Sequence, residues 1–245
     1  HSVNECWAVS SFTKEKLRDV QKVPDNKIRL FYNTIDPFFG YPADFQKPAY
    51  LLSRYKLTAN QPILFTLTRL QSSEKYKGYD KVIAAVANLK EKFPTIQYLI
   101  AGKTDKSEAN RINELIAYYK VSKHVKLIGF IDDLEVTDHY LLADLYVMPS
   151  RKEGFGIVFI EAMACGLPVI AGNEDGSRDA LLNGELGTLV NPTDDVAILT
   201  AIENHLTILN KEGVSIANKQ ILQQKVKNHF GFDCYKQRME AFFSN

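Results

Sequence analysis

The sequence has few of the residues that mark specialised classes of protein. Its 245 residues include three cysteines and one tryptophan, and the formal charges nearly cancel, at +1. Cys6, Cys165 and Cys234 are far apart and odd in number, which excludes a disulfide framework and a zinc site and predicts free thiols in the reducing cytoplasm. The near-zero net charge gives no support to nucleic acid or an anionic membrane as the main partner.

Long apolar runs are also absent. No run approaches the roughly 18 apolar residues that a membrane helix needs, so we expect membrane association only through a part of the protein outside this chain. The opening His1-Ser2-Val3-Asn4 has neither an initial Met nor the features of a signal peptide. We therefore expect a cut inside a longer chain. The length and the 45% apolar content suit one large α/β domain.

Short apolar runs alternate along the chain with longer amphipathic stretches. Because several runs are apolar throughout, they suit parallel strands that are buried on both faces. The alternation predicts an α/β fold with a Rossmann-like, doubly wound parallel sheet. The expected strands are 6–9, 28–32, 62–68, 96–101, 125–127, 145–148, 168–171 and 188–190. The expected helices are 13–20, 79–93, 109–119, 134–142, 157–165, 177–183, 196–209, 211–229 and 232–243.

The chain divides into three parts by its pattern. Residues 1–50 contain two short strands, one helix and a stretch rich in proline and aromatic residues, and we interpret them as a bridge from an absent N-terminal domain. Residues 51–229 hold the regular alternation and form the Rossmann-like domain. Residues 230–245 form a C-terminal helix.

Glycines and charged residues follow the expected strands, where the ligands of an open parallel sheet bind. Arg69 and the lysines at 75 and 77 follow one strand, and Gly102 follows the next. Two cations beside one loop suit a diphosphate, because each charge-assisted hydrogen bond to phosphate contributes about 1.5–3 kcal/mol. The alternative is a loop whose lysines face water.

A second motif joins a glycine-rich turn to an apolar helix. Glu153-Gly154-Phe155-Gly156 leads directly into 157–165, and such a junction points free N–H groups at an anion. Phe159 stands where the dinucleotide fingerprint needs its third glycine, so an ordinary NAD site is disfavoured. Glu161 is the one charge in this helix, and a buried carboxylate needs partners. A ribose diol could supply them, as could a neighbouring Arg, Lys or backbone N–H.

The spacing of Glu153 and Glu161, within E-G-F-G-I-V-F-I-E-A-M-A-C-G-L-P-V-I, resembles that of a large family of retaining glycosyltransferases with the two-domain GT-B fold. This is the family called glycosyl transferases group 1, or the E-x7-E family. Asn33-Thr34-Ile35-Asp36 is similar to the junction that follows the family's first domain. The resemblance covers nearly the whole chain, but only the family's C-terminal, donor-binding domain.

The resemblance implies a role for each matching residue. Arg69 and Lys77 resemble the pair that holds the donor diphosphate and stabilises the leaving phosphate, and Glu153 resembles the glutamate beside the donor sugar. These are the three expected catalytic residues. Glu161 resembles the glutamate that binds ribose. The other expected substrate contacts are Gly102, the pair Phe130 and Ile131 where the family's base-binding loop falls, and the backbone of Phe155, Gly156, Ile157 and Val158 at the sugar and phosphate.

The resemblance further implies a retaining hexosyl transfer from a UDP- or GDP-sugar, with no metal and no separate cofactor, in polysaccharide biosynthesis. The acceptor, a sugar or a lipid-linked sugar, belongs to the absent domain, so we expect this chain alone to transfer poorly. Lys75 competes with Lys77 for the lysine role, and 172–177 replaces the family's usual G-G-x-x-E run. The alternatives are a nucleotide-sugar epimerase of the same architecture and a non-catalytic nucleotide-binding domain.

Overall fold

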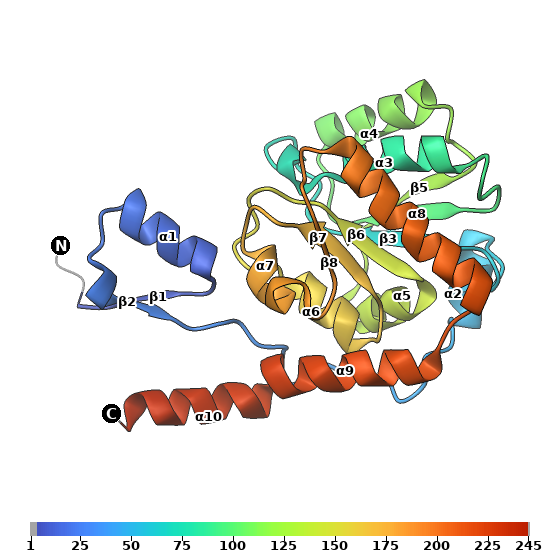
Figure 1. Ribbon diagram of the computed structural model, residues 1–245. Helices are drawn as coiled ribbons and strands as arrows, with labels where there is room; N and C mark the ends of the chain where they lie inside the picture. Colours follow the sequence, from blue (N-terminus) through green and yellow to red (C-terminus); the bar gives the residue numbers. More distant parts are fainter. Residues whose placement is uncertain (1–3, 245) are drawn as a thin grey trace.

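The computed structural model describes residues 4–244 and confirms the predicted fold class (Figure 1). Six parallel strands form one sheet in the order β5-β4-β3-β6-β7-β8. They are β3 (Ile63–Leu67), β4 (Gln97–Ala101), β5 (Val125–Gly129), β6 (Leu145–Met148), β7 (Val169–Gly172) and β8 (Thr188–Val190). From β3 the chain adds strands outward to β5 on one side, and from β6 it adds strands outward to β8 on the other. The switch point of this doubly wound sheet therefore lies between β3 and β6. The expected cut at His1–Val3 and the terminal Asn245 lie outside the described residues.

Helices cover both faces of this sheet because successive strand residues point to opposite sides. In β3, Leu64 belongs to the core cluster under α3 (Tyr79–Leu89), α4 (Lys106–Tyr118) and α8 (Asp195–Glu212), and the next residue, Phe65, belongs to the cluster on the other face. The helices on the second face are α2 (Ala49–Tyr55), α5 (Val136–Leu142), α6 (Ile157–Ala164), the short α7 (Ser177–Ala180) and α9 (Ile216–Phe230).

A small separate unit stands beside the main sheet. The strands β1 (Cys6–Ala8) and β2 (Ile28–Leu30) pair in parallel and are joined by α1 (Ser11–Asp19). The last helix, α10 (Phe232–Phe243), returns to this unit, as Figure 1 shows. The ring centroids of Phe31 and Tyr235 are 5.0 Å apart, and those of Trp7 and Phe243 are 6.2 Å apart. The first and last segments of the chain, separate in the sequence division, therefore pack together.

The expected helix over 211–229 is wrong at its start. The helix α8 continues to Glu212, Gly213 turns the backbone with a φ of 71°, and α9 begins only after Ser215. The Ser215 side chain accepts a hydrogen bond from the backbone N–H of Asn218, which caps the new helix. A glycine stop followed by a serine cap therefore divides one amphipathic pattern into two helices. The short helix α2, after Pro48, was not predicted.

The cysteines and the helices also bear on the expected absence of disulfides and membrane spans. All three cysteines are free, with Cys165 buried. None of the helices within residues 4–244 combines the length and the apolar character that crossing a membrane requires.

Candidate functional site

A cavity of about 610 Å³ opens at the carboxyl end of β3, beside the switch point of the sheet. The end of β3, the helices α5 and α6, and the linker that follows β2 all contribute side chains to it. A cavity of this size at this place in an α/β sheet suits a small polar ligand. Its walls consist of Asp36, Phe38, Phe39, Gly40, Leu67, Asp133, Leu134, Val136, Thr137 and Glu161.

Glu161 is the predicted site residue that lines this cavity. It lies on α6, and the hydroxyl of Tyr140 donates to its Oε2 at 3.0 Å. Burial raises the pKa of this carboxyl above its ordinary value, the hydrogen bond from Tyr140 opposes the rise, and the nearby carboxylates of Asp36 and Asp133 add to it. No Arg, Lys or backbone N–H within the described residues bonds this carboxylate. Its remaining acceptor capacity is therefore open to a ligand.

The raised pKa leads to a prediction about stability. A carboxyl whose pKa is higher in the folded protein than in the unfolded chain destabilises the fold as pH rises between those two values. Glu161→Gln should match the wild type in acid, where both side chains are neutral, and become the more stable protein as pH rises through the folded-state pKa. Urea unfolding across a pH series measures the difference.

The exposed Glu174 supplies the matched control for that series. Glu174→Gln makes the same change of charge without a buried carboxyl, so its stability should follow that of the wild type throughout. A Glu161→Gln difference that stays constant with pH would contradict the assigned environment of Glu161.

The N-terminus of α6 has the geometry predicted for an anion site. Gly156 precedes the helix with a φ of 89°, and a Cβ there would lie 2.3 Å from the ring of Phe159. Only glycine fits this turn without displacing the ring. The helix has no side-chain cap, so the first-turn N–H groups, on Ile157 and Val158, are left for another acceptor. Phe155 itself is buried in the core.

The structure brings Lys77 and Glu153 together. Lys77 ends a short 3-10 helix, Lys75–Lys77, and its ammonium forms an ion pair with the Glu153 carboxylate. The side chain of Lys77 is 7% exposed and that of Glu153 is 18% exposed. Lys75 instead faces solvent, so the fold directs Lys77, not Lys75, toward the predicted sugar-binding glutamate.

Arg69 lies on the same loop but points elsewhere. Its guanidinium is mostly exposed and pairs with Glu74, with 2.6 Å between Nη2 and Oε1. The two predicted phosphate-binding cations are thus each paired with a carboxylate of the protein. A phosphate ligand would have to compete with those carboxylates for the cations.

Two aspartates that the sequence did not single out hold the loops of the site. Asp175 is buried and accepts hydrogen bonds from Ser150 Oγ, at 2.7 Å, and from the backbone N–H of Glu153, at 2.6 Å. It therefore anchors the loop that carries Glu153. Asp179 accepts from the backbone N–H and the hydroxyl of Ser11, which ties α7 to the small unit. For Asp175 the available signal was an aspartate whose side chain can accept from the backbone N–H two residues on, as it does from Ser177 at 3.0 Å. Asp179 lies within α7 and had no such signal.

The remaining predicted residues lie around the cavity without lining it. Ile131 is in the core and Phe130 is 71% exposed, and the cavity takes Asp133 and Leu134 from that segment in their place. Gly102 ends β4 against the backbone of Thr68. Sequence reasoning also missed the linker's contribution, although the aromatic pair that follows Asp36 was visible as a signal.

No set of three His, Cys, Asp or Glu side chains within residues 4–244 is arranged to hold a metal ion. The metal independence of any reaction remains a prediction.

Comparison with known families places the chain. Residues 53–219 match the family described as glycosyl transferases group 1. The chain belongs to this family. The matched segment runs from α2 into α9 and so includes the main sheet and the whole of α6.

Relatives of this glycosyltransferase chain include a mannosyltransferase and a sucrose-phosphate synthase. The GDP-mannose-dependent alpha-(1-6)-phosphatidylinositol monomannoside mannosyltransferase of Mycolicibacterium smegmatis is 34% identical over 161 residues, which are 63% of this chain and 41% of that protein. The solved sucrose-phosphate synthase of Thermosynechococcus elongatus is 28% identical, with a TM-score of 0.79, over 97% of this chain and 57% of that one.

A third comparison bears on the fold alone. The HepE protein of Anabaena, solved in complex with UDP and glucose, superposes with a TM-score of 0.80 at 22% identity, over 99% of this chain and 63% of that one. The glycosyltransferase chain thus spans less than two thirds of the length of each of these three proteins.

Proposed function

We propose that this chain is the donor-binding part of a retaining glycosyltransferase, and that the cavity beside Glu161 holds the nucleoside of a nucleotide sugar. The observation that carries the proposal is the Glu161 carboxylate itself. It is half-buried, it receives a hydrogen bond from Tyr140, and it opens onto a cavity of about 610 Å³. The two hydroxyls of a ribose are donors of the kind that such a carboxylate lacks.

The charges of the cavity favour guanine as the base. Asp133 and Asp36 add two carboxylates to the wall, and carboxylates accept hydrogen bonds but donate none when ionised. Guanine presents two adjacent N–H donors on one edge, whereas uracil presents one. The relative from Mycolicibacterium smegmatis is named for its dependence on GDP-mannose, which supports the same choice.

The diphosphate would lie between the α6 N-terminus and the cations of the 69–77 loop. The N–H groups of Ile157 and Val158 and the positive end of the helix dipole would face it. Lys77 would leave Glu153 for a phosphate oxygen and release Glu153 to accept from the donor sugar's hydroxyls. Arg69, which is exposed and paired with Glu74, could reorient toward the second phosphate.

In this arrangement, the protein would promote transfer by stabilising the charge that develops on the leaving diphosphate. As the bond from the anomeric carbon to the diphosphate breaks, negative charge grows on the leaving oxygen and the sugar takes on oxocarbenium character. Fixed cations and N–H groups stabilise that charge without a metal ion. The acceptor hydroxyl attacks the anomeric carbon from the face that the diphosphate leaves and passes its proton to the leaving phosphate oxygen, so the hexose keeps its anomeric configuration.

None of the residues named above is proposed to bind the acceptor. Because the chain spans 41% of the mannosyltransferase relative, we propose that the rest of a longer cytoplasmic enzyme binds the acceptor sugar or lipid-linked sugar. We expect this chain alone to bind the donor and to transfer it poorly.

Calorimetric titration with GDP, UDP and ADP, with and without EDTA, tests the proposal. We expect GDP to bind most tightly, with the same Kd in EDTA. Glu161→Ala should weaken binding by about tenfold, because it removes a carboxylate that accepts from ribose. Thermal unfolding of each variant confirms that the fold is intact.

The other outcomes of this titration are equally informative. Preference for UDP would keep the donor site and overturn the choice of guanine. Binding that Glu161→Ala leaves unchanged would overturn the assignment of the cavity to the nucleoside. No binding at millimolar GDP by a folded protein would overturn donor binding by this chain.

A further inference from the structure

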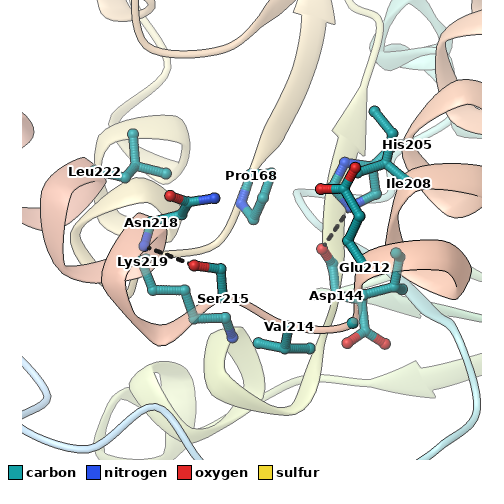
Figure 2. A pocket seen from close by; sticks show the side chains of 13 residues that line it. Asp144, Pro168, His205, Ile208, Glu212, Val214, Ser215, Asn218, Lys219 and Leu222 are labelled. Atoms are coloured by element: carbon teal, nitrogen blue, oxygen red, sulfur yellow. Dashed lines mark hydrogen bonds between the residues drawn. The ribbon is translucent and has the colours of Figure 1, made fainter.

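A second cavity lies at the opposite edge of the sheet. It has a volume of about 230 Å³ and lies between α8, α9 and the amino ends of β6 and β7 (Figure 2). Asp144 and Pro168, which line it, directly precede those two strands. The donor site belongs to the carboxyl ends of the strands, so nothing in the proposed transfer reaction uses this cavity.

Lys219 is the unusual residue in this cavity. It lies on α9, lines the cavity and is 8% exposed. In the described part of the chain, no hydrogen bond or ion pair is formed by its ammonium. Figure 2 shows its side chain extending from α9 toward Val214. The side chain is largely buried, but the ammonium at its tip is not among the fully buried atoms that lack a partner, so it reaches solvent. Burial lowers the pKa of Lys219, and the carboxylate of Asp144 opposes this effect.

Asp144 cannot serve as the missing partner because other groups hold it. Its Oδ2 pairs with the Lys47 ammonium at 2.7 Å and accepts from the Ile63 backbone N–H at 2.8 Å. The separation between Lys219 Nζ and the Asp144 carboxylate exceeds the 4.0 Å limit of an ion pair. Lys47 and Asp144 thus form a pair, and among the described residues the ammonium of Lys219 has no ion-pair partner.

The start of α9 adds to this positive charge. Ser215 caps the helix, and both Ser215 and Asn218 line the cavity together with Lys219. The helix is 15 residues long, so its N-terminus carries a partial positive charge. The N–H groups of Asn218 and Lys219 are already bonded to Ser215, so this helix end would act on an anion through its dipole, beside the cation of Lys219. The cavity's other carboxylate, on Glu212, comes from α8, across the cavity from α9 (Figure 2).

Apart from His205, whose Nε2 lies 3.1 Å from the carbonyl oxygen of Asp144, most of the remaining wall is apolar. Pro168, Ile208, Leu222 and Val214 contribute to its walls. Ile208 is 56% exposed and Val214 is 50% exposed, so the apolar surface continues to the mouth of the cavity. A cavity of about 150 Å³ accepts benzene, and this one is larger. An apolar body about the size of a phenyl ring or a short aliphatic chain therefore fits.

We propose that this cavity binds a small apolar carboxylate, an aromatic or short aliphatic acid. Its carboxylate meets the Lys219 ammonium at the start of α9, and its apolar body lies against Pro168, Ile208 and Val214. The site is separate from the donor site, and its occupancy does not depend on the proposed transferase function.

Titration of the intact chain with benzoate and hexanoate, followed by two-dimensional NMR, tests this proposal. We expect Kd values of about 1 mM or below, with shifts concentrated at Ser215, Asn218 and Leu222. Benzyl alcohol and hexanol keep the apolar body without the charge, and acetate keeps the charge without the body. Each should bind at least about tenfold more weakly, because it lacks one of the two interactions.

Two lysine variants on one helix supply the matched comparison. Lys219→Met keeps the length of the side chain, removes the ammonium and should weaken benzoate binding by about tenfold or more. Lys225→Met changes an exposed lysine of α9 and should leave benzoate binding unchanged. Lys219→Met should not unfold the protein, because it removes the charge from a largely buried side chain. The proposal fails if neither acid binds at 10 mM, a limit of about 2.7 kcal/mol, or if Lys219→Met binds benzoate as the wild type does.

Discussion

Lys77→Met is expected to raise the Kd for a nucleoside diphosphate by about 100-fold, the largest effect at the proposed donor site. The change removes a cation that is 7% exposed and leaves the Glu153 carboxylate without its partner. That carboxylate would then repel the phosphates, because little water screens charges at so low an exposure. Calorimetric titration of the folded variant with GDP measures the loss.

Lys77→Met also breaks an ion pair, so its effect on stability is measured separately from its effect on binding. Without Lys77, the carboxylate at position 153 is an unpaired and largely buried charge, so Lys77→Met should lower the free energy of unfolding by about 1–3 kcal/mol. Adding Glu153→Gln removes that charge and should restore most of the stability without restoring phosphate binding. Recovery of both by the double variant would mean that Lys77 acts only by neutralising the Glu153 carboxylate and does not itself bind phosphate.

A substitution of the exposed Lys75 tests whether the loss of binding is specific to position 77. Lys75→Met carries the same change of net charge on the same loop, and it should weaken binding far less than Lys77→Met. If Lys75→Met has the greater effect, Lys75 takes the phosphate-binding role, and the burial of Lys77 serves the fold.

Gly102→Ala is expected to cost the most stability of any change near the site, about 3 kcal/mol or more. Gly102 ends β4 with a φ of 139°, and an added Cβ would lie 1.7 Å from the carbonyl oxygen of Thr68. An L-residue rarely adopts this backbone conformation. The atom that the added Cβ would meet belongs to the backbone of Thr68, the residue directly after β3. The two strands would have to separate at the edge where the donor is proposed to bind. Urea unfolding measures the loss.

Gly129 provides the matched control at the end of the adjacent strand, β5. It has a φ of 80°, and nothing lies within 4 Å of an added Cβ. Gly129→Ala therefore tests the backbone strain alone and should cost about 1 kcal/mol. Equal losses in the two variants would show that the approach of Thr68 to Gly102 contributes nothing to stability.

The fold class followed from local pattern because parallel strands buried on both faces require apolar runs. The runs in 62–68 and 145–148 marked β3 and β6 to within a residue or two. The glycines and charges after those runs also indicated which edge of the sheet carries a site, since every parallel strand ends at that edge. Glu161, the single charge on an apolar helix, was expected to be buried, but it is only half-buried because it faces the cavity.

Other features depended on which distant segments meet. The pairing of Lys77 with Glu153 joins residues 76 positions apart, and it arises because the β3 and β6 loops are neighbours in the strand order. The linker residues Phe38 and Phe39 line the first cavity only because the chain passes the sheet edge after β2. Neither contact has a signature in either segment alone.

The sequence by itself therefore determined most elements of this protein, though not α2, the class of its sheet, and the edge at which the predicted donor motifs lie. These depend on the periodicity of apolar residues and on glycines at strand ends, which are local properties. The tertiary structure decided the partners. It returned α10 to the β1–β2 unit, paired Lys77 with Glu153, and placed Lys219 in a cavity where, among the described residues, its ammonium has no ion-pair partner. Burial and charge pairing arise only when separate segments of the chain pack together, so they depend on the tertiary structure.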